Sequence, residues 1–308
     1  MTTRLLRILT SLAAIVLLAL PAHAQAADVD IITPHITDAH EIEVPWPTWP
    51  TMHTVVELPR WAPFTLPGTH IEVDMSPTKH VVWMLIAALT VAALLIFAAN
   101  AQRRQTRTSG HAKGFAGGIE AMVLYIRNEV VMPNVGPNGN AFAPYLLTLF
   151  FFILFCNLWG IFPWGSTATG NVAVTATLAI ITFFVIEISG MRALGLGYFS
   201  TMFYWNKDMP LPLRIFMFVI LSPIEVIGKL TKPFALTIRL FANMTAGHIV
   251  VLALIGMIFS FKSYAIGLAP LAMAIAINLL ELFVAFLQAF IFTLLSSVFI
   301  GQIREAHH

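Results

Sequence analysis

Two apolar segments in the C-terminal third of the chain most constrain its fold. They cover residues 213–260 and 264–303, and as helices they would measure about 72 and 60 Å. The hydrocarbon core of a bilayer is only about 30 Å thick. Each helix would therefore lie far from the membrane normal unless it is kinked, and Pro223 and Pro233 offer kinks in the first. We expect a long, strongly tilted helical hairpin that turns on the outer side near residues 262–264.

The remainder of the chain contains three shorter apolar spans. Residues 81–99 include no charged side chain, and two further spans cover about 143–163 and 172–190. Only 10% of the 308 residues are charged and the net charge is +2, which excludes an ordinary soluble domain and gives no basic surface for nucleic acid. The sequence predicts an all-α integral membrane protein with about five membrane helices, including the two long ones.

The distribution of charge orients these spans. Arg103, Arg104, Arg107 and Lys113 follow the first span with no acid among them. By the positive-inside rule this span runs from the outside to the cytoplasm. Residues 114–132 then alternate apolar and charged side chains with a helical period, which predicts an amphipathic helix on the cytoplasmic surface. The C-terminus is expected in the cytoplasm.

The N-terminal part divides into two segments before the membrane domain at 79–308. Residues 1–24 resemble a signal peptide cleaved after Ala24, because the apolar run of about 13 residues is too short to span a bilayer. The alternative is an uncleaved anchor helix. Residues 25–78 hold eight prolines and eight acids, which predicts an extracytoplasmic segment with little helix.

The sequence gives little support for a metal site and none for an internal disulfide bond. The histidines of the acidic segment are widely spaced, which disfavours a metal site; they are His35, His40, His53 and His70. The single cysteine, Cys156, lies in an apolar run and cannot form an internal disulfide, so a packing role is expected.

Ionisable groups at membrane depth are the candidates for function. They are Glu225, Lys229, Lys232, Arg239 and His248 in the first long segment and Glu281 in the second. Such a group is functional by default, unless it snorkels to the headgroups. We expect Lys229, Lys232 and Arg214 to snorkel. Arg239 has apolar neighbours on both sides, and an arginine at mid-bilayer costs about 2.5–3.5 kcal/mol.

Helical phase separates these groups into two places. Asn243 lies about 40° from Arg239 around the helix, whereas His248 lies about 180° away. In a hairpin that turns near residue 263, Glu281 stands level with His248 and Gln288 stands level with Arg239. We therefore expect an arginine flanked by amides, and separately a titratable Glu/His couple nearer the outer face.

At these residues the sequence resembles subunit a of the F-type ATP synthase. The likeness is carried by residues 230–248, LTKPFALTIRLFANMTAGH, and residues 287–295, LQAFIFTLL. The resemblance implies that Arg239 is the essential stator arginine facing the rotating c-ring, with Asn243 and Gln288 beside it. It also implies that Glu225 lies toward the cytoplasmic half-channel. Many bacterial relatives carry an acid at position 248 and a histidine at 281, so this chain exchanges the pair.

The resemblance implies a stator subunit that offers two proton half-channels to the c-ring in a bacterial plasma (inner) membrane. The implied partners are the c-ring, the peripheral-stalk subunit b, other synthase subunits, lipid and protons; no cofactor is implied. The chain shows no nucleotide loop or catalytic triad, so catalysis by the chain alone is not expected.

The alternative is a secondary transporter or ion channel, although no second copy of the Arg239 region is present. A purely structural anchor would leave Arg239, His248 and Glu281 unexplained. The choice between proton and sodium stays open.

Overall fold

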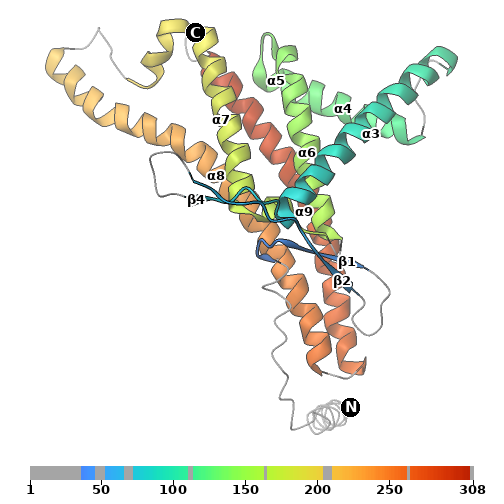
Figure 1. The fold of residues 1–308 in the computed structure, drawn as a ribbon. Helices are drawn as coiled ribbons and strands as arrows, with labels where there is room; N and C mark the ends of the chain where they lie inside the picture. Colours follow the sequence, from blue (N-terminus) through green and yellow to red (C-terminus); the bar gives the residue numbers. More distant parts are fainter. Residues whose placement is uncertain are drawn as a thin grey trace, which may run out of the picture.

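The computed structural model describes residues 36–45, 53–65, 72–109, 114–162, 165–203, 210–261 and 264–305. Within these ranges five helices are long and apolar enough to cross a membrane. They belong to α3 (Lys79–Ser109), α6 (Ala143–Ile161), α7 (Val172–Leu194), α8 (Leu211–Phe261) and α9 (Tyr264–Glu305) (Figure 1). The predicted class, an all-α integral membrane protein with about five spans, is confirmed. The predicted signal peptide, residues 1–24, lies outside the described residues.

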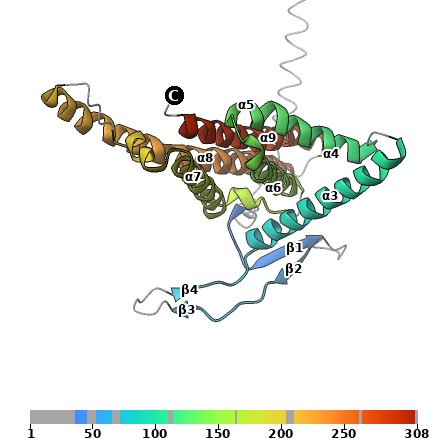
Figure 2. The same ribbon diagram turned by 90° about the horizontal axis from the view of Figure 1, so that it is seen from above.

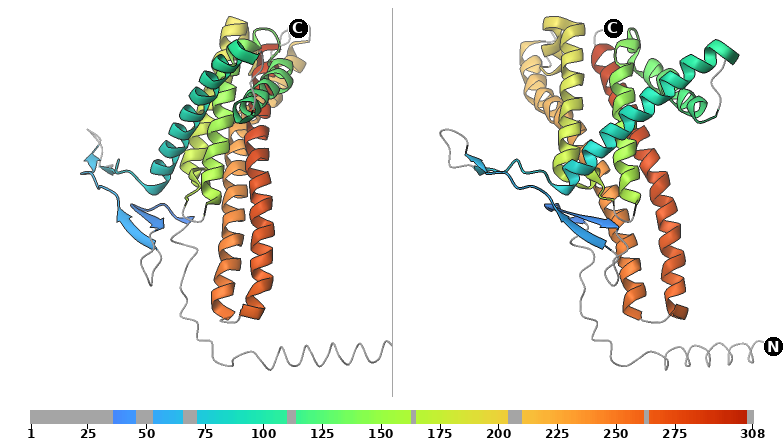
Figure 3. Two further views of the ribbon diagram at one scale, coloured as in Figure 1. Left: turned by 90° about the vertical axis from the view of Figure 1, so that its right-hand side faces the viewer. Right: turned by 45° about the vertical axis from the view of Figure 1, so that its right-hand side comes forward.

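Helices α8 and α9 form the long pair that the sequence predicts, with 51 and 42 residues. They run side by side along most of their length, and beyond the other helices they continue as a pair (Figure 3). Pro223 and Pro233 lie inside α8, which bends partway along its length (Figure 1). The tilt of the pair in a bilayer stays a prediction.

The core lies where α6 packs against α8 and α9. Phe151, Ile153 and Leu154 of α6 are fully buried, as are Leu240 of α8 and Ala289 of α9. Close packing of these apolar side chains holds three helices that are far apart in the sequence. The outward faces of α8 and α9 are also apolar, as expected for helices that contact lipid or another membrane protein.

The amphipathic segment is one continuous helical path in three parts. These parts are α4 (Gly114–Tyr125), a π-helical turn η1 (Ile126–Val131) and α5 (Met132–Val135). The path ends three residues later than predicted, because Pro133 falls in the first turn of α5, where proline fits. Gly136, with φ of 72°, ends it. Its place on the membrane surface stays a prediction.

The acidic segment forms two small strand pairs, which the sequence did not predict. Strand β1 (Glu41–Pro45) pairs antiparallel with β2 (His53–Glu57), and β3 (Phe64–Thr65) pairs with β4 (Glu72–Val73). We call the described residues between 36 and 78 the strap. Figure 2 shows both strand pairs on the side of the bundle where α3 begins.

Three short 3-10 turns complete the described elements: η2 (Gly139–Ala141), η3 (Ala168–Gly170) and η4 (Gly195–Thr201). Turn η3 joins α6 to α7 at the end of the bundle where the strap lies, which we call the strap end. Arg304 lies at the opposite end, where its guanidinium donates to the carbonyls of Val135 and Pro137 at 3.2 and 2.7 Å.

Candidate functional site

A small cavity at the strap end surrounds His248. Met244, Thr245 and His248 of α8 line one side, and Ser166, Thr167 and Gly170 of the η3 loop line another. Ile36 of the strap and His80 of α3 complete the lining. We call this the His248 cavity. It brings together a titratable side chain on α8 and a second histidine that the sequence analysis did not single out.

Glu281 lies beside this region on α9. Its side chain is buried, and its Oε1 has no hydrogen-bond partner. A Cβ atom placed on Gly247 would lie only 3.3 Å from Glu281 Oε1, so the carboxyl group packs directly on the backbone of α8. The carboxyl group of Glu281 therefore lies level with the residue before His248, which agrees with the depth expected from the hairpin count.

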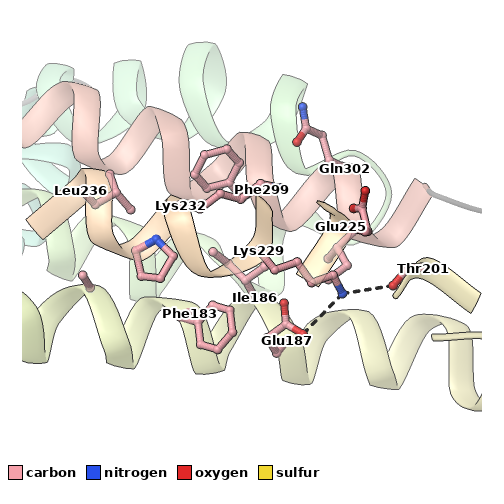
Figure 4. A pocket seen from close by; sticks show the side chains of 13 residues that line it. Phe183, Ile186, Glu187, Thr201, Glu225, Lys229, Lys232, Leu236, Phe299 and Gln302 are labelled. Atoms are coloured by element: carbon pink, nitrogen blue, oxygen red, sulfur yellow. Dashed lines mark hydrogen bonds and ion pairs between the residues drawn. The ribbon is translucent and has the colours of Figure 1, made fainter. Parts of the chain in front are cut away.

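A second cavity, of about 170 Å³, lies among α7, α8 and α9, nearer the opposite end. Its polar lining includes Glu187, Glu225, Lys229, Lys232 and Gln302 (Figure 4). We call it the Glu225 cavity. Glu225 itself is exposed, so the cavity combines an accessible carboxylate with polar groups from the two neighbouring helices.

Lys229 does not snorkel, which corrects the prediction. Its ammonium group is buried and lies 3.6 Å from Glu187 Oε2. It donates to Thr201 Oγ1 at 3.1 Å (Figure 4), and it also donates to Tyr198 Oη at 3.2 Å. A buried ammonium group that finds a carboxylate and two hydroxyl oxygens has no reason to extend to the headgroups.

Glu187 is therefore a site residue that the sequence analysis missed. It is the sole acid in the apolar span 172–190, and this isolation was the available signal. Lys232 also turns inward, because its Nζ lies 4.7 Å from the centre of the Phe299 ring. The snorkelling of Arg214 stays a prediction.

Arg239 lies on α8 between the two cavities and lines neither of them. Its side chain is exposed, and so is Asn243, one turn further along the same face. Gln288, by contrast, is buried on α9. Arg239 and His248 are thus directed to different surroundings, as helical phase predicts, whereas only one of the two expected amides shares the exposed face of Arg239.

Across the described ranges no group of three or more His, Cys, Asp or Glu side chains is placed to hold a metal ion. Cys156 is buried and unpaired by disulfide. His35 and His70 lie outside the described residues.

Fold and site together define a multi-pass membrane protein in which one long helix carries polar cavities at two levels and an exposed arginine between them. The model of the ATP synthase A chain family matches residues 81–301, and this chain belongs to that family. The resemblance expected from residues 230–248 is confirmed.

Curated relatives agree with the family match. The ATP synthase subunit a of Chloroherpeton thalassium is 46% identical over 87% of this chain and 74% of its own length. The ATP synthase subunit a 2 of Chlorobium luteolum is 43% identical over 94% of this chain and 83% of its own length. In Anaeromyxobacter sp., subunit a is 46% identical, with 77% of this chain and 56% of the relative covered.

Proposed function

We propose that this chain is the stator subunit a of a proton-translocating F-type ATP synthase. Membership of the family supports this role and the presence of other synthase subunits as partners. The finer proposal is that the chain supplies two proton half-channels to a rotating c-ring, with Arg239 between them. One observation carries it: Arg239 stands on α8 between two polar cavities that share no lining residue.

Distances along α8 support two separate half-channels. Glu225 and Arg239 are 14 residues apart, or about 21 Å along a helix, and Arg239 and His248 are nine residues apart, or about 14 Å. Both separations are too long for a proton to pass directly between side chains. A proton that enters at His248 therefore needs another carrier to reach Glu225.

The inlet in this proposal comprises the His248 cavity and Glu281. The proton passes from His248 and Glu281 to a carboxylate of the c-ring, and the neutral carboxyl group then moves into lipid, which would be costly for a charged group. The c-ring carries the proton around and releases it into the Glu225 cavity. Rotation is coupled to proton flow in this proposal because the two cavities share no lining residue, so that the ring carries the proton between them.

Arg239 separates inlet from outlet by electrostatics. A guanidinium group stays charged at any physiological pH, so it favours the deprotonated form of a passing carboxyl group and repels a proton in transit. Besides Asn243, the exposed side chains near it on α8 include the apolar Phe234 and Ile238. In this low-dielectric setting its charge acts strongly on the c-ring carboxylate.

The remaining partners and the location follow from the same proposal. The membrane is the plasma (inner) membrane of a bacterium, with the mature N-terminus outside and the C-terminus in the cytoplasm. Arg103 and Arg104 follow the first span, which supports this orientation. The peripheral-stalk subunit b holds the chain against rotation, and ATP is made by other subunits of the complex.

The test uses the assembled synthase in inverted membrane vesicles. Arg239→Ala is expected to abolish ATP-driven proton pumping, measured by quenching of a pH-sensitive dye, while the complex still contains its c-ring. Arg192→Ala is the matched control, because Arg192 is an exposed arginine near the end of α7 and lies outside both cavities. Normal pumping by Arg239→Ala would refute the proposal, as would solute uptake by the chain without a c-ring.

A further inference from the structure

The strap is joined to the membrane helices through Asp38. Its Oδ1 lies 2.7 Å from His80 Nδ1 of α3, and its Oδ2 accepts a hydrogen bond from Asn171 Nδ2 at 3.1 Å. The Asn171 side chain also caps α7, because its Oδ1 accepts from the Ala173 amide at 2.8 Å. One carboxylate thus connects the strap to the first residues of two membrane helices.

The Asp38 and His80 side chains differ sharply in their access to water. The side chain of Asp38 is 32% exposed, whereas that of His80 is only 4% exposed. The pair thus places a carboxylate that water can reach against an imidazole group inside the protein, and imidazole is the side chain best suited to bind and release protons near neutral pH.

His80 and His248 line the same cavity, from α3 and from α8. The cavity leaves about 20 Å³ for the centres of water molecules, which is enough to admit one water. Ser166 Oγ and Thr167 Oγ1, which also belong to the lining, are buried without hydrogen-bond partners. Two unsatisfied hydroxyl groups in such a space are the groups that a water molecule would satisfy.

We propose that Asp38 and His80 form the outer entry of the proton inlet, so that the strap is a working part of the proton path. The proposal rests on the function proposed above. A proton from the outside water binds to the Asp38–His80 pair, passes through a water molecule in the cavity and reaches the His248 imidazole. Each transfer breaks one N–H or O–H bond and forms another, and the donor is protonated again from outside.

The charged and titratable groups around His80 define the expected pH response. Asp38 faces His80 from the strap, Lys79 is its neighbour on α3, and His248 lies across the cavity. The η3 loop contributes only hydroxyl and backbone groups to the cavity. We therefore expect the rate of ATP synthesis to change in a step as the pH on the strap side passes through the range in which imidazole groups bind protons. This step should disappear when His80 is replaced.

The experiment measures ATP synthesis by the complete synthase in proteoliposomes at a fixed membrane potential, while the pH on the strap side is varied. His80→Gln keeps an amide donor for Asp38 but cannot carry a proton. We expect this variant to slow ATP synthesis by about tenfold. The loss is smaller than that for removing a proton-transfer group outright, because water still delivers some protons to His248. We expect Asp38→Asn to act in the same direction and Asp38→Glu to restore most of the rate. Glu57→Gln is the control, because Glu57 is an exposed strap acid outside the cavity.

Hydrogen exchange at Lys79 separates a proton path from a simple fastening. The Lys79 amide donates to Ala39 of the strap at 2.9 Å, so its exchange rate reports whether the strap is docked. Slow synthesis by His80→Gln with unchanged exchange supports the proposal. Slow synthesis with faster exchange would show that the pair only fastens the strap, and a normal rate with a normal pH profile would equally overturn the proposal.

Failure of this inference is distinguishable from failure of the proposed function. If Arg239→Ala uncouples the synthase while His80→Gln behaves as wild type, only the outer entry is wrong. If Arg239→Ala leaves coupling intact, the stator proposal itself falls, whatever the strap variants do.

Discussion

Glu187 Oε2 lies 3.6 Å from Lys229 Nζ, across the contact between α7 and α8. Both side chains are more than nine-tenths buried, with 9% and 8% of their surface exposed. The pair therefore fixes the position of α8 against α7 close to Glu225, the exposed acid of the same cavity.

Breaking this pair should destabilise the protein more than removing both of its members. Lys229→Met leaves a buried carboxylate without its partner, which costs about 3–5 kcal/mol. The double variant Lys229→Met with Glu187→Leu should recover most of the loss. The Tm of the purified synthase and the amount of this chain retained in it measure the effect. Arg103→Met, at an exposed position, is the control, and equal losses in the single and double variants would contradict the prediction.

Gly247 should be sensitive to a single added methyl group because of its contact with Glu281. The Cβ of Gly247→Ala would lie 3.3 Å from Glu281 Oε1 and 3.4 Å from Cδ, so the carboxyl group must move by a few tenths of an ångström. We expect slower proton pumping with little change in assembly, and a larger loss for Gly247→Val.

Gly228 provides the matched control on the same helix. A Cβ at Gly228 meets no atom within 4 Å, so Gly228→Ala should leave pumping unchanged. Its effect on stability should be favourable, by up to about 1 kcal/mol, because alanine is the better helix former. Equal effects at the two glycines would show that the Glu281 contact is unimportant.

Exchanging the two titratable residues of the proposed inlet should recover activity that either single change loses. His248→Glu places two acids at the same level beside Gly247, and Glu281→His places two imidazoles there. The double variant restores one acid and one imidazole, with their positions exchanged. Pumping rates of the three variants measure the coupling, and purely additive losses would argue against a shared inlet.

The docking of the strap should weaken in acid. Burial raises the pKa of Asp38, but the hydrogen bond and positive charge of His80 outweigh it, so the pKa of Asp38 lies below its ordinary value. Because the pKa is lower in the folded protein, the stabilisation is present above the ordinary value of about 3.9 and is lost as the pH falls through the lower folded value.

Pepsin digestion between pH 2 and 5 tests this directly. We expect cleavage of the strap to increase as the pH falls below the ordinary aspartate value of about 3.9 and through the lower value of docked Asp38. At each pH the cleavage rate of the unaltered protein is divided by that of Asp38→Asn, which removes the pH dependence of pepsin itself. A ratio that does not change with pH would contradict the assignment of the transition to Asp38.

The membrane helices could be predicted from the sequence because hydropathy and length are local properties. The predicted spans 143–163 and 172–190 correspond to α6 and α7 within a few residues. The strand pairs of the strap could not be predicted, because pairing β1 with β2 depends on the register between two short segments of five residues each.

The candidate site was predictable only along one helix at a time. Helical phase predicted that Arg239 and His248 point in different directions. In the structure His248 lines a cavity, whereas Arg239 is exposed. The same reasoning misplaced Lys229, because position along α8 says nothing of an acid on α7. Asp38 and His80 were missed for a similar reason: 42 residues separate them, and contacts of that kind come from tertiary structure.

The bond between Asp38 and Asn171 has a consequence for biogenesis. Its partners are 133 residues apart, so in the proposed orientation Asn171 is synthesised well after Asp38 has crossed the membrane. In that orientation the segment around Asp38 has no Asn171 to bind until α7 has been synthesised and has joined the bundle. Seating of the strap then marks a subunit whose first three spans have come together, and a chain truncated before residue 171 would expose this segment to proteases.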